Sequence, residues 1–272
     1  MVRLIAIDWS GDRLLAHRRI WLAEAVEPGR LVRLEAGRDR AAIGDHLLRL
    51  SRTAHAPFVV GLDFGFSFPA WFMTQLGARE APDLWAHVAA HGERWLAACA
   101  PPFWGRRGRP RPVCSDPPLR RCEAALPRVN GIAPKSMFQI GGAGAVGTGS
   151  LRGMPLLHAL HAQGATIWPF TVGGWPVVVE IYPRLLTGPV RKSSGTARST
   201  YLAERYPRLD AEHVRSAAAS EDAFDAAVSA LVMAEHAADL AALPAETDPI
   251  FSQEGRIWHP SQLPTPNSKL PT

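Results

Sequence analysis

Residues 57–69, PFVVGLDFGFSFP, constrain the fold more strongly than any other stretch of the chain. The stretch opens with consecutive apolar residues and shows no alternation of apolar and polar positions, which is typical of a strand buried on both faces. Strands of this kind occur in sheets that are largely parallel and covered by helices on both sides. The stretch therefore predicts an α/β fold.

The segments around this strand predict its neighbours in the sheet. Residues 2–8, 14–25 and 31–37 are three apolar runs separated by turn signals, which predict a meander of three strands. Residues 39–53 have leucine and isoleucine at helical spacing, and residues 176–183, PVVVEIYP, predict a fifth strand. We expect a mixed five-stranded sheet flanked by helices.

The chain has 272 residues, of which 47 % are hydrophobic, enough for a sizeable core. We expect a single domain over residues 1–272, in which about 66–175 form a long helical and loop insertion after the fourth strand. Helical patterns occur at 83–99, at 155–163 and, rich in alanine, at 220–242. The polar, proline-rich end, about 261–272, is expected to be poorly ordered.

Composition excludes several classes of protein. No charged leader precedes a long apolar stretch, and no apolar run is long enough to cross a bilayer, so we expect a cytoplasmic protein without a membrane partner. Three cysteines without C-x-x-C spacing indicate neither a disulfide framework nor a zinc site. The net charge of +5 suits a polyanionic partner, although only Lys135, Lys192 and Lys269 are lysines.

Carboxylates occur at equivalent places in this scheme. Asp8, in IAIDWSG, ends the first strand and Asp63 ends the fourth; as parallel neighbours, these strands would bring both acids to one sheet edge. Glu180 ends the fifth strand. Asp222 and Asp225 lie three positions apart on one face of the last long helix, which could pack at the same edge. We predict a carboxylate cluster.

Such a cluster favours a bound cation. Carboxylates within a few ångströms of one another repel and have raised pKa values unless a cation lies among them. Hard oxygen ligands suit Mg²⁺ or Mn²⁺ better than zinc. Two such ions, about 3.5–4 Å apart, can activate water and stabilise the leaving oxygen in phosphodiester hydrolysis.

Each acid also has a purely structural interpretation. Asp8 and Asp63 could cap the turns that follow them. Glu180 could bond a backbone group or pair with Arg184. Asp222 lies in a first helical turn, where acids favour the helix dipole. The helix dipole explains Asp225 less well, because this residue lies deeper in the helix.

These pieces together resemble a known family, the predicted RNase H-like nucleases of domain of unknown function 429. The matching pieces cover about residues 2–260, in the order IAIDWSG, GLDFGFSFP, FQIGGAGAVGTGSLRGMP, EIYP, EDAFDAAVSALVMA and EGRIWHP. The helix with two aspartates also resembles the C-terminal acidic helix of Holliday-junction resolvases. The resemblance implies an RNase H-like core in which Asp8, Asp63, Asp222 and Asp225 are the metal-binding acids. The insertion after the fourth strand is longer than the pattern of this family requires. Glu180 is an acid beyond the four that the pattern needs.

A second feature suits a nucleic-acid partner, DNA or RNA. The segment PPFWGRRGRPRP places four arginines beside Trp104, a combination that can hold phosphates and stack on bases. These arginines are Arg106, Arg107, Arg109 and Arg111. The alternatives are a solvated loop, or one whose arginines neutralise the acidic cluster.

Other motifs are expected to be structural. The glycine-rich residues 141–150 lack the Gly-Lys-Ser/Thr ending of a P-loop and predict a turn before the helix at 155. His158 and His161 lie three apart but have no third ligand in view, so we expect packing or surface roles.

The sequence therefore predicts a Mg²⁺- or Mn²⁺-dependent nuclease. In this interpretation Asp8 bridges the metals, Asp63 and Asp225 complete their coordination, and Asp222 or Glu180 orients water. Two alternatives stay open. The first is a nucleotide-binding phosphotransferase related to actin-like ATPases, although these need two such domains. The second is a non-catalytic RNase H-like binding module, whose acids would be dispersed or paired with arginines.

Overall fold

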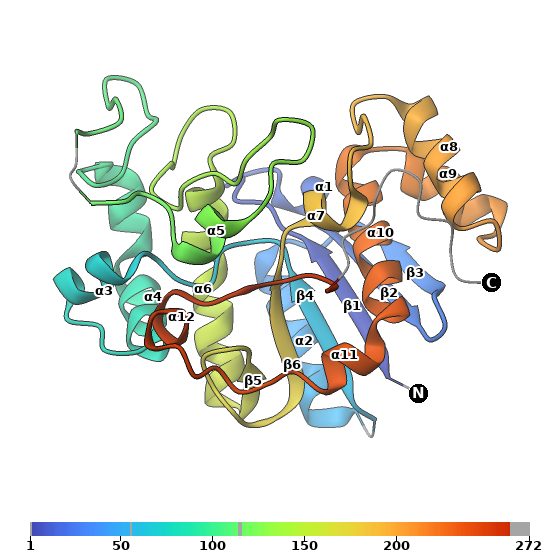
Figure 1. Cartoon of the computed structure of the whole chain (residues 1–272), viewed down its shortest axis with the longest axis horizontal. Helices are drawn as coiled ribbons and strands as arrows, with labels where there is room; N and C mark the ends of the chain where they lie inside the picture. Colours follow the sequence, from blue (N-terminus) through green and yellow to red (C-terminus); the bar gives the residue numbers. More distant parts are fainter. Residues whose placement is uncertain (1, 55, 114–115, 262–272) are drawn as a thin grey trace.

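A mixed sheet of seven strands forms the centre of the protein (Figure 1). The computed structural model describes residues 2–54, 56–113 and 116–261. The strand order is β3-β2-β1-β4-β6-β5, with β7 paired to β6. The strands are β1 (Arg3–Asp8), β2 (Trp21–Val26), β3 (Arg30–Glu35), β4 (Phe58–Leu62), β5 (Ala165–Ile167), β6 (Gly174–Ile181) and β7 (Ile257–Trp258).

Strand β2 runs antiparallel to both of its neighbours, whereas β1, β4, β6, β5 and β7 pair in parallel. The α/β class and the mixed sheet are thus confirmed. The expected number of five strands is wrong, because β5 and β7 add to the sheet. Their three and two residues are too few to produce a periodic sequence signal.

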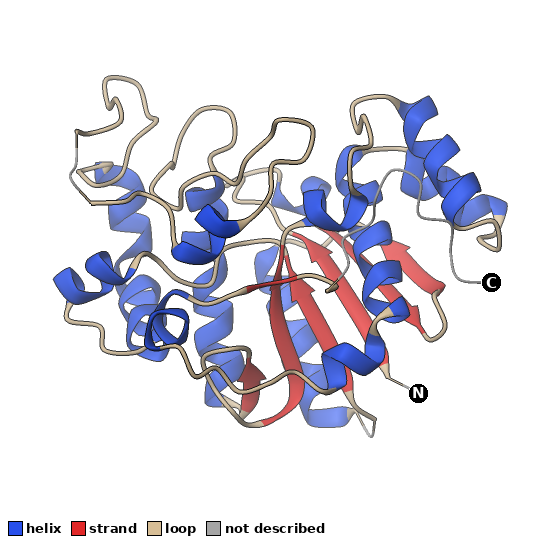
Figure 2. Ribbon diagram, viewed as in Figure 1, coloured by secondary structure: helices blue, strands red, loops and turns tan. Residues whose placement is uncertain are grey.

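Helices cover both faces of the sheet (Figure 2). They are α1 (Ala16–Arg19), α2 (Arg40–Thr53), α3 (Ala70–Leu76), α4 (Ala81–Ala98), α5 (Arg121–Ala125), α6 (Val146–Ala162), α7 (Pro183–Thr187), α8 (Gly195–Arg205), α9 (Ala211–Ala218), α10 (Glu221–Glu235), α11 (Ala237–Ala241) and α12 (Pro249–Glu254). Across the described ranges, none of these helices has the length and apolar character needed to span a membrane.

The alternation of side chains along β1 divides the core into two layers. Ile5 and Ile7 join a cluster with apolar side chains of α2, α4 and α6, while Leu4 and Ala6 join a second cluster with α10 on the opposite face. All four side chains are fully buried. A strand buried on both faces thus forms the centre of a three-layer α/β protein.

Two expected elements differ in extent. Residues 14–25 do not form one strand, because α1 takes up the first part and β2 begins only at Trp21. Helix α6 begins at Val146, inside the glycine-rich segment, and not at 155. Glycine permits this close packing, since a Cβ atom on Gly153 would lie 2.6 Å from the ring of Phe64. The predicted tail falls on residues 262–272, which lie outside the described residues.

The carboxyl ends of β1, β4 and β6 lie at one edge of the sheet, the upper edge in Figure 1. The short helices α1 and α7 follow β1 and β6 there, and the long loops of the insertion lie on the same side. Carboxyl ends of parallel strands are the usual place for a site in open α/β sheets.

Candidate functional site

Two of the predicted acids meet at this edge. The parallel register of β1 and β4 ends at Ile7 and Leu62, and the N–H of Asp63 extends it by donating to the carbonyl of Ile7 at 3.1 Å. Asp8, the last residue of β1, is therefore next to the start of the loop that carries Asp63. Asp8 is 9 % exposed and Asp63 is half-buried.

Helix α10 brings the other two aspartates to the same place. Ser220 caps this helix, its Oγ accepting from the N–H of Ala223 at 3.0 Å. The helix packs across β1 and β2. Asp222 lies half-buried in the first turn, and Asp225, one turn further on, is 9 % exposed.

The four aspartates form one electrostatic cluster. Burial raises the pKa of Asp8 well above its ordinary value, and the charges of Asp63, Asp225 and Asp222 raise it further. Burial, followed by the charge of Asp225, raises the pKa of Asp63 to about 8. Burial also raises the pKa values of Asp222 and Asp225. Carboxylates from three distant segments thus influence one another at this edge, as the sequence predicted.

The turn after β1 does not require Asp8 as its cap. Its polar contacts come from Ser10, whose Oγ accepts from the N–H of Asp12 at 3.2 Å, and from Asp12, which accepts from the N–H groups of Leu14 and Leu15 at 2.9 Å. Arg40 donates to the carbonyls of Ser10 and Asp12 at 2.9 and 2.7 Å. The turn is held by its own residues, which weakens the structural interpretation of Asp8.

The sequence reasoning missed Lys192, which also belongs to the cluster. This lysine is 7 % exposed, and its ammonium donates to Oδ2 of Asp225 in an ion pair. It lies between α7 and α8, 33 residues from its partner, where no periodic pattern could reveal the contact. Its one signal is identity, since lysine is rare in a chain whose basic residues are mostly arginines.

The acids offer oxygen atoms of the kind that a hard divalent cation prefers. Asp8, Asp63 and Asp225 offer carboxylate oxygens, and Oδ1 of Asp225 is buried without a hydrogen-bond partner. Over the described residues, no three His, Cys, Asp or Glu side chains form a ready-made metal-binding group. The donors are thus gathered at one edge, but not arranged around one position.

Glu180 is a neighbour of this cluster with a different environment. It pairs with Leu62 across β4 and β6 and is 3 % exposed. Its Oε2 accepts from Arg120 and from the N–H of Phe66, both at 2.8 Å, and its Oε1 also accepts from Arg120. The ion-pair partner is therefore Arg120 and not Arg184, which donates to the carbonyl of Val190.

Arg120 in turn holds a second buried acid. Its Nε and one terminal nitrogen donate to Oε1 of Glu123 at 3.1 and 2.9 Å, and its other terminal nitrogen donates to the carbonyl of Glu254 at 3.0 Å. Burial raises the pKa of Glu123. This hydrogen-bond network joins α5, β6 and α12 next to the loop that carries Asp63. Glu180 therefore helps to hold that loop in place.

A cavity of about 180 Å³ opens beside Asp63. Trp9, Lys135, Gly149 and Tyr182 contribute to its walls. The first turns of α6 approach closely here, because the Trp9 indole donates to the carbonyl of Gly149 at 3.1 Å. The start of α6, inside the glycine-rich segment, therefore forms one wall of the cavity beside Asp63.

The arginine-rich loop lies outside the cluster. Arg106, Arg107, Arg109 and Arg111 are all exposed, and Arg111 also stacks over the ring of Trp104, 5.3 Å from its centroid. The N–H of Trp104 donates to the carbonyl of Phe138 at 3.0 Å, which ties the loop to the segment that leads into α6. The loop rises on the same side of the sheet as the acids (Figure 1).

The two candidate histidines have ordinary environments. His158 is exposed on α6, and His161 lies edge-on to Trp85, with ring centroids 6.0 Å apart. These positions agree with the expected surface and packing roles.

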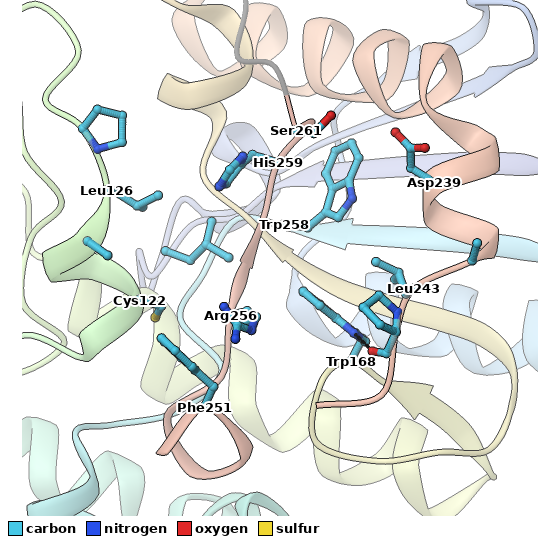
Figure 3. Close-up of a pocket in the computed structure, with 15 residues that line it drawn as sticks. Cys122, Leu126, Trp168, Asp239, Leu243, Phe251, Arg256, Trp258, His259 and Ser261 are labelled. Atoms are coloured by element: carbon cyan, nitrogen blue, oxygen red, sulfur yellow. Dashed lines mark hydrogen bonds between the residues drawn. The ribbon is translucent and has the colours of Figure 1, made fainter. Parts of the chain in front are cut away.

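A larger cavity, of about 640 Å³, lies apart from the candidate acids (Figure 3). Its walls include Trp168, Phe251, Arg256 and Trp258, and none of the predicted site residues. Cys122 also borders it, but burial raises the pKa of this thiol to about 12, so it is not a thiolate at neutral pH.

No family model, no curated protein and no solved structure matches this chain.

Proposed function

We propose that this chain is a divalent-metal-dependent nuclease that hydrolyses phosphodiester bonds in nucleic acid. One observation carries the proposal: Asp8, Asp63 and Asp225, from three distant segments, lie in one buried cluster in which their pKa values are raised. Burying like charges together opposes folding. Clusters of this kind are concentrated at functional sites, where a ligand compensates the charge.

The residues that would hold Mg²⁺ or Mn²⁺ are Asp8, Asp63 and, through its unpartnered Oδ1, Asp225. When bound, such an ion supplies positive charge to the phosphoryl oxygens and makes a nearby water more acidic. We propose that Asp222, half-buried at the start of α10, would orient the attacking water. Glu180 acts as a positioning residue, because it holds the N–H of Phe66, three residues beyond Asp63.

The residues around the acidic cluster suit the phosphodiester backbone of a nucleic acid. The cavity beside Asp63 has Lys135 in its wall, and the exposed Arg106, Arg107 and Arg109 rise on the same side of the sheet. A net charge of +5 favours a polyanion. We propose that the cavity receives one nucleotide unit and that the arginines contact the backbone beyond it.

The order β3-β2-β1-β4-β6, with β2 antiparallel to its neighbours, supports an RNase H-like core within the larger sheet. We propose on the sequence resemblance alone that the chain belongs to the predicted RNase H-like nucleases of domain of unknown function 429. The additional strands β5 and β7 pair with β6 and not with β1 or β4, the strands that lead to Asp8 and Asp63.

A cleavage panel tests the proposal. Single-stranded DNA, single-stranded RNA, duplex, hybrid and branched substrates are incubated with the protein and Mg²⁺ or Mn²⁺, or with a chelator. We expect cleavage of at least one substrate, dependent on metal and lost in Asp225→Asn. Asp45→Asn, an exposed position on α2, is the matched control and should retain the activity. Cleavage that persists in Asp225→Asn would contradict the role given to the acidic cluster, whereas cleavage that never occurs would favour the non-catalytic binding module.

A further inference from the structure

The turn between β1 and α1 exposes two leucines in succession. Leu14 is 79 % exposed and Leu15 is 39 % exposed, whereas the end of β1 and Ala16 in α1 are buried. The chain thus leaves the core for this short stretch and then returns to it. We call residues 13–15 the leucine tip. Single exposed leucines are common on protein surfaces, so the surroundings of the tip decide whether it has a function.

The leucine tip has a fixed backbone. The carboxylate of Asp12 accepts from the N–H groups of Leu14 and Leu15, both at 2.9 Å. The turn before the tip packs closely against α6, because a Cβ atom on Gly11 would lie 2.6 Å from the backbone nitrogen of Gly149. The exposure of Leu14 is therefore set by the fold and does not come from a loose loop.

The leucine tip lies beside the acidic cluster. It continues the turn that follows Asp8, the last residue of β1. Helix α1 comes directly after the tip, at the upper edge of the sheet in Figure 1. Burial raises the pKa of Asp222, whereas the charge of Arg19 in α1 lowers it, so α1 lies close to the start of α10. A substrate bound at the acids would therefore lie close to the tip.

Exposed cations surround Leu14. Arg13 within the tip and Arg18 in α1 are exposed, and the side chain of Arg19 is 58 % exposed. By contrast, Val172, which is 91 % exposed, lies in a stretch, residues 168–175, that has no charged residue. Arginines contact phosphates, and leucine is one of the side chains that proteins insert between base pairs. An apolar side chain among arginines thus suits a double helix.

We infer that Leu14 is an apolar wedge that enters between two stacked base pairs of a double-stranded substrate, next to the phosphodiester at the acids. The inference rests on the proposed function and names its substrate class, since a single strand has no base-pair step to open. Opening the step is unfavourable, and contacts between the bent duplex and the protein offset it. Leu14 determines specificity and takes no part in hydrolysis.

An exposed leucine beside arginines also suits the surface of an anionic membrane. Two observations favour nucleic acid. The tip adjoins the acids, whose proposed substrate is a polyanion. Helix α1 has four residues, which is too short for the continuous apolar face of a helix that lies in a membrane surface.

Unstacking of a base within a duplex tests the inference. Duplexes that carry 2-aminopurine at one position each are mixed rapidly with the full chain and Mg²⁺, and the fluorescence, which rises when the base leaves the stack, is read before cleavage. We expect a rise at one position with the unaltered protein. Leu14→Ser should abolish this rise and weaken duplex binding about tenfold, because burial of the leucine is lost. Leu14→Phe, which supplies another wedge-forming side chain, should restore the rise.

Val172→Ser is the matched control, because Val172 is strongly exposed and precedes the amino end of β6, at the opposite edge of the sheet. It should leave the rise and the affinity unchanged. Both changes affect exposed side chains, so neither disturbs the core.

Three results would overturn the inference and leave the proposed nuclease standing: a duplex that binds without any rise, an equal rise in Leu14→Ser, or binding and cleavage of single strands only. No binding of any nucleic acid would overturn the proposed function as well. Vesicles of phosphatidylcholine and phosphatidylglycerol test the membrane. Vesicle binding that is lost in Leu14→Ser, with the duplex signal unchanged, would assign the tip to a lipid surface.

Discussion

At the scale of single residues, the main feature is a carboxylate at the buried end of a central strand. Asp8 is surrounded by groups that oppose its ionisation, and the adjoining turn is held by other residues. Stability alone does not explain an aspartate at this position. Residues that serve function often reduce stability in this way.

Replacing Asp8 with asparagine should therefore stabilise the metal-free protein while removing its response to metal. Asparagine keeps the size of the side chain but not its buried charge. We expect a gain of about 1 kcal/mol, or roughly 2–4 °C in melting temperature. Thermal unfolding in a chelator at pH 8 measures this effect. A loss of more than about 1 kcal/mol would mean that the Asp8 carboxylate contributes to the fold.

Replacing Glu180 with glutamine should have the opposite effect. Glutamine leaves the Arg120 guanidinium without its buried acceptor, and breaking a buried ion pair costs about 3–5 kcal/mol. Urea unfolding measures the loss, and Asp239→Asn, which breaks an exposed pair with His236, should cost under about 1 kcal/mol. Binding of Mn²⁺ should stay unchanged. A protein of full stability that binds less Mn²⁺ would identify Glu180 as a metal ligand.

The sequence predicts the positions of some site residues but not those of their partners. The positions of Asp8 and Asp63 follow from strand ends, and that of Asp225 from helical spacing, so local patterns were sufficient to group them. The partners Lys192 and Arg120 are 33 and 60 residues from the acids they hold. Contacts over such distances depend on how loops pack, which no local periodicity encodes.

At the scale of elements, the clearest departure from expectation is α6. Glycine is a poor helix former, so the sequence predicts a turn where the helix already runs. Packing overrides propensity here: a Cβ on Gly147 would lie 2.0 Å from the carbonyl oxygen of Met137. The longer regular elements, such as α2, α4, β4 and β6, have clear periodic or apolar patterns and were predicted.

This account predicts opposite effects for two glycine-to-alanine changes. Gly153→Ala on α6 should destabilise the protein by about 1–3 kcal/mol, because the new methyl group would lie 2.6 Å from the Phe64 ring. Gly44→Ala on α2 is the control: its nearest neighbour would be 3.6 Å away, and it should stabilise by about 0.4–1 kcal/mol. Denaturant unfolding measures both effects. A stabilising Gly153→Ala would show that α6 is not closely packed against Phe64, in the segment that follows β4.

At the scale of the whole molecule, an α/β protein with a mixed sheet follows from the sequence, because a strand buried on both faces requires helices on both sides. The number of strands does not follow, since β5 and β7 form only when the insertion packs beside β6. The same sheet brings the aspartates of the cluster together. Their combined negative charge therefore affects the stability of the entire fold.

The metal-free protein should lose stability as the pH rises from about 4 to about 8. Asp63 has a pKa of about 8 in the folded protein against 3.8 for an ordinary aspartate, so in this window the folded state holds a proton that the unfolded state has released. Stability then falls by up to about 1.4 kcal/mol per pH unit for each such proton. Urea unfolding at pH 6 and pH 8 in a chelator measures the slope, which Asp63→Asn should reduce. A slope of the opposite sign would contradict the buried cluster.

The central claim is that Asp8, Asp63 and Asp225 hold a divalent ion, and Mn²⁺-dependent thermal stabilisation tests it most directly. A ligand at 100 times its dissociation constant stabilises the folded state by about 2.7 kcal/mol. We predict that Mn²⁺ raises the melting temperature of the unaltered protein and of Asp45→Asn by several degrees, and leaves Asp63→Asn unchanged. An equal rise in Asp63→Asn, or no rise in the unaltered protein, would contradict the account.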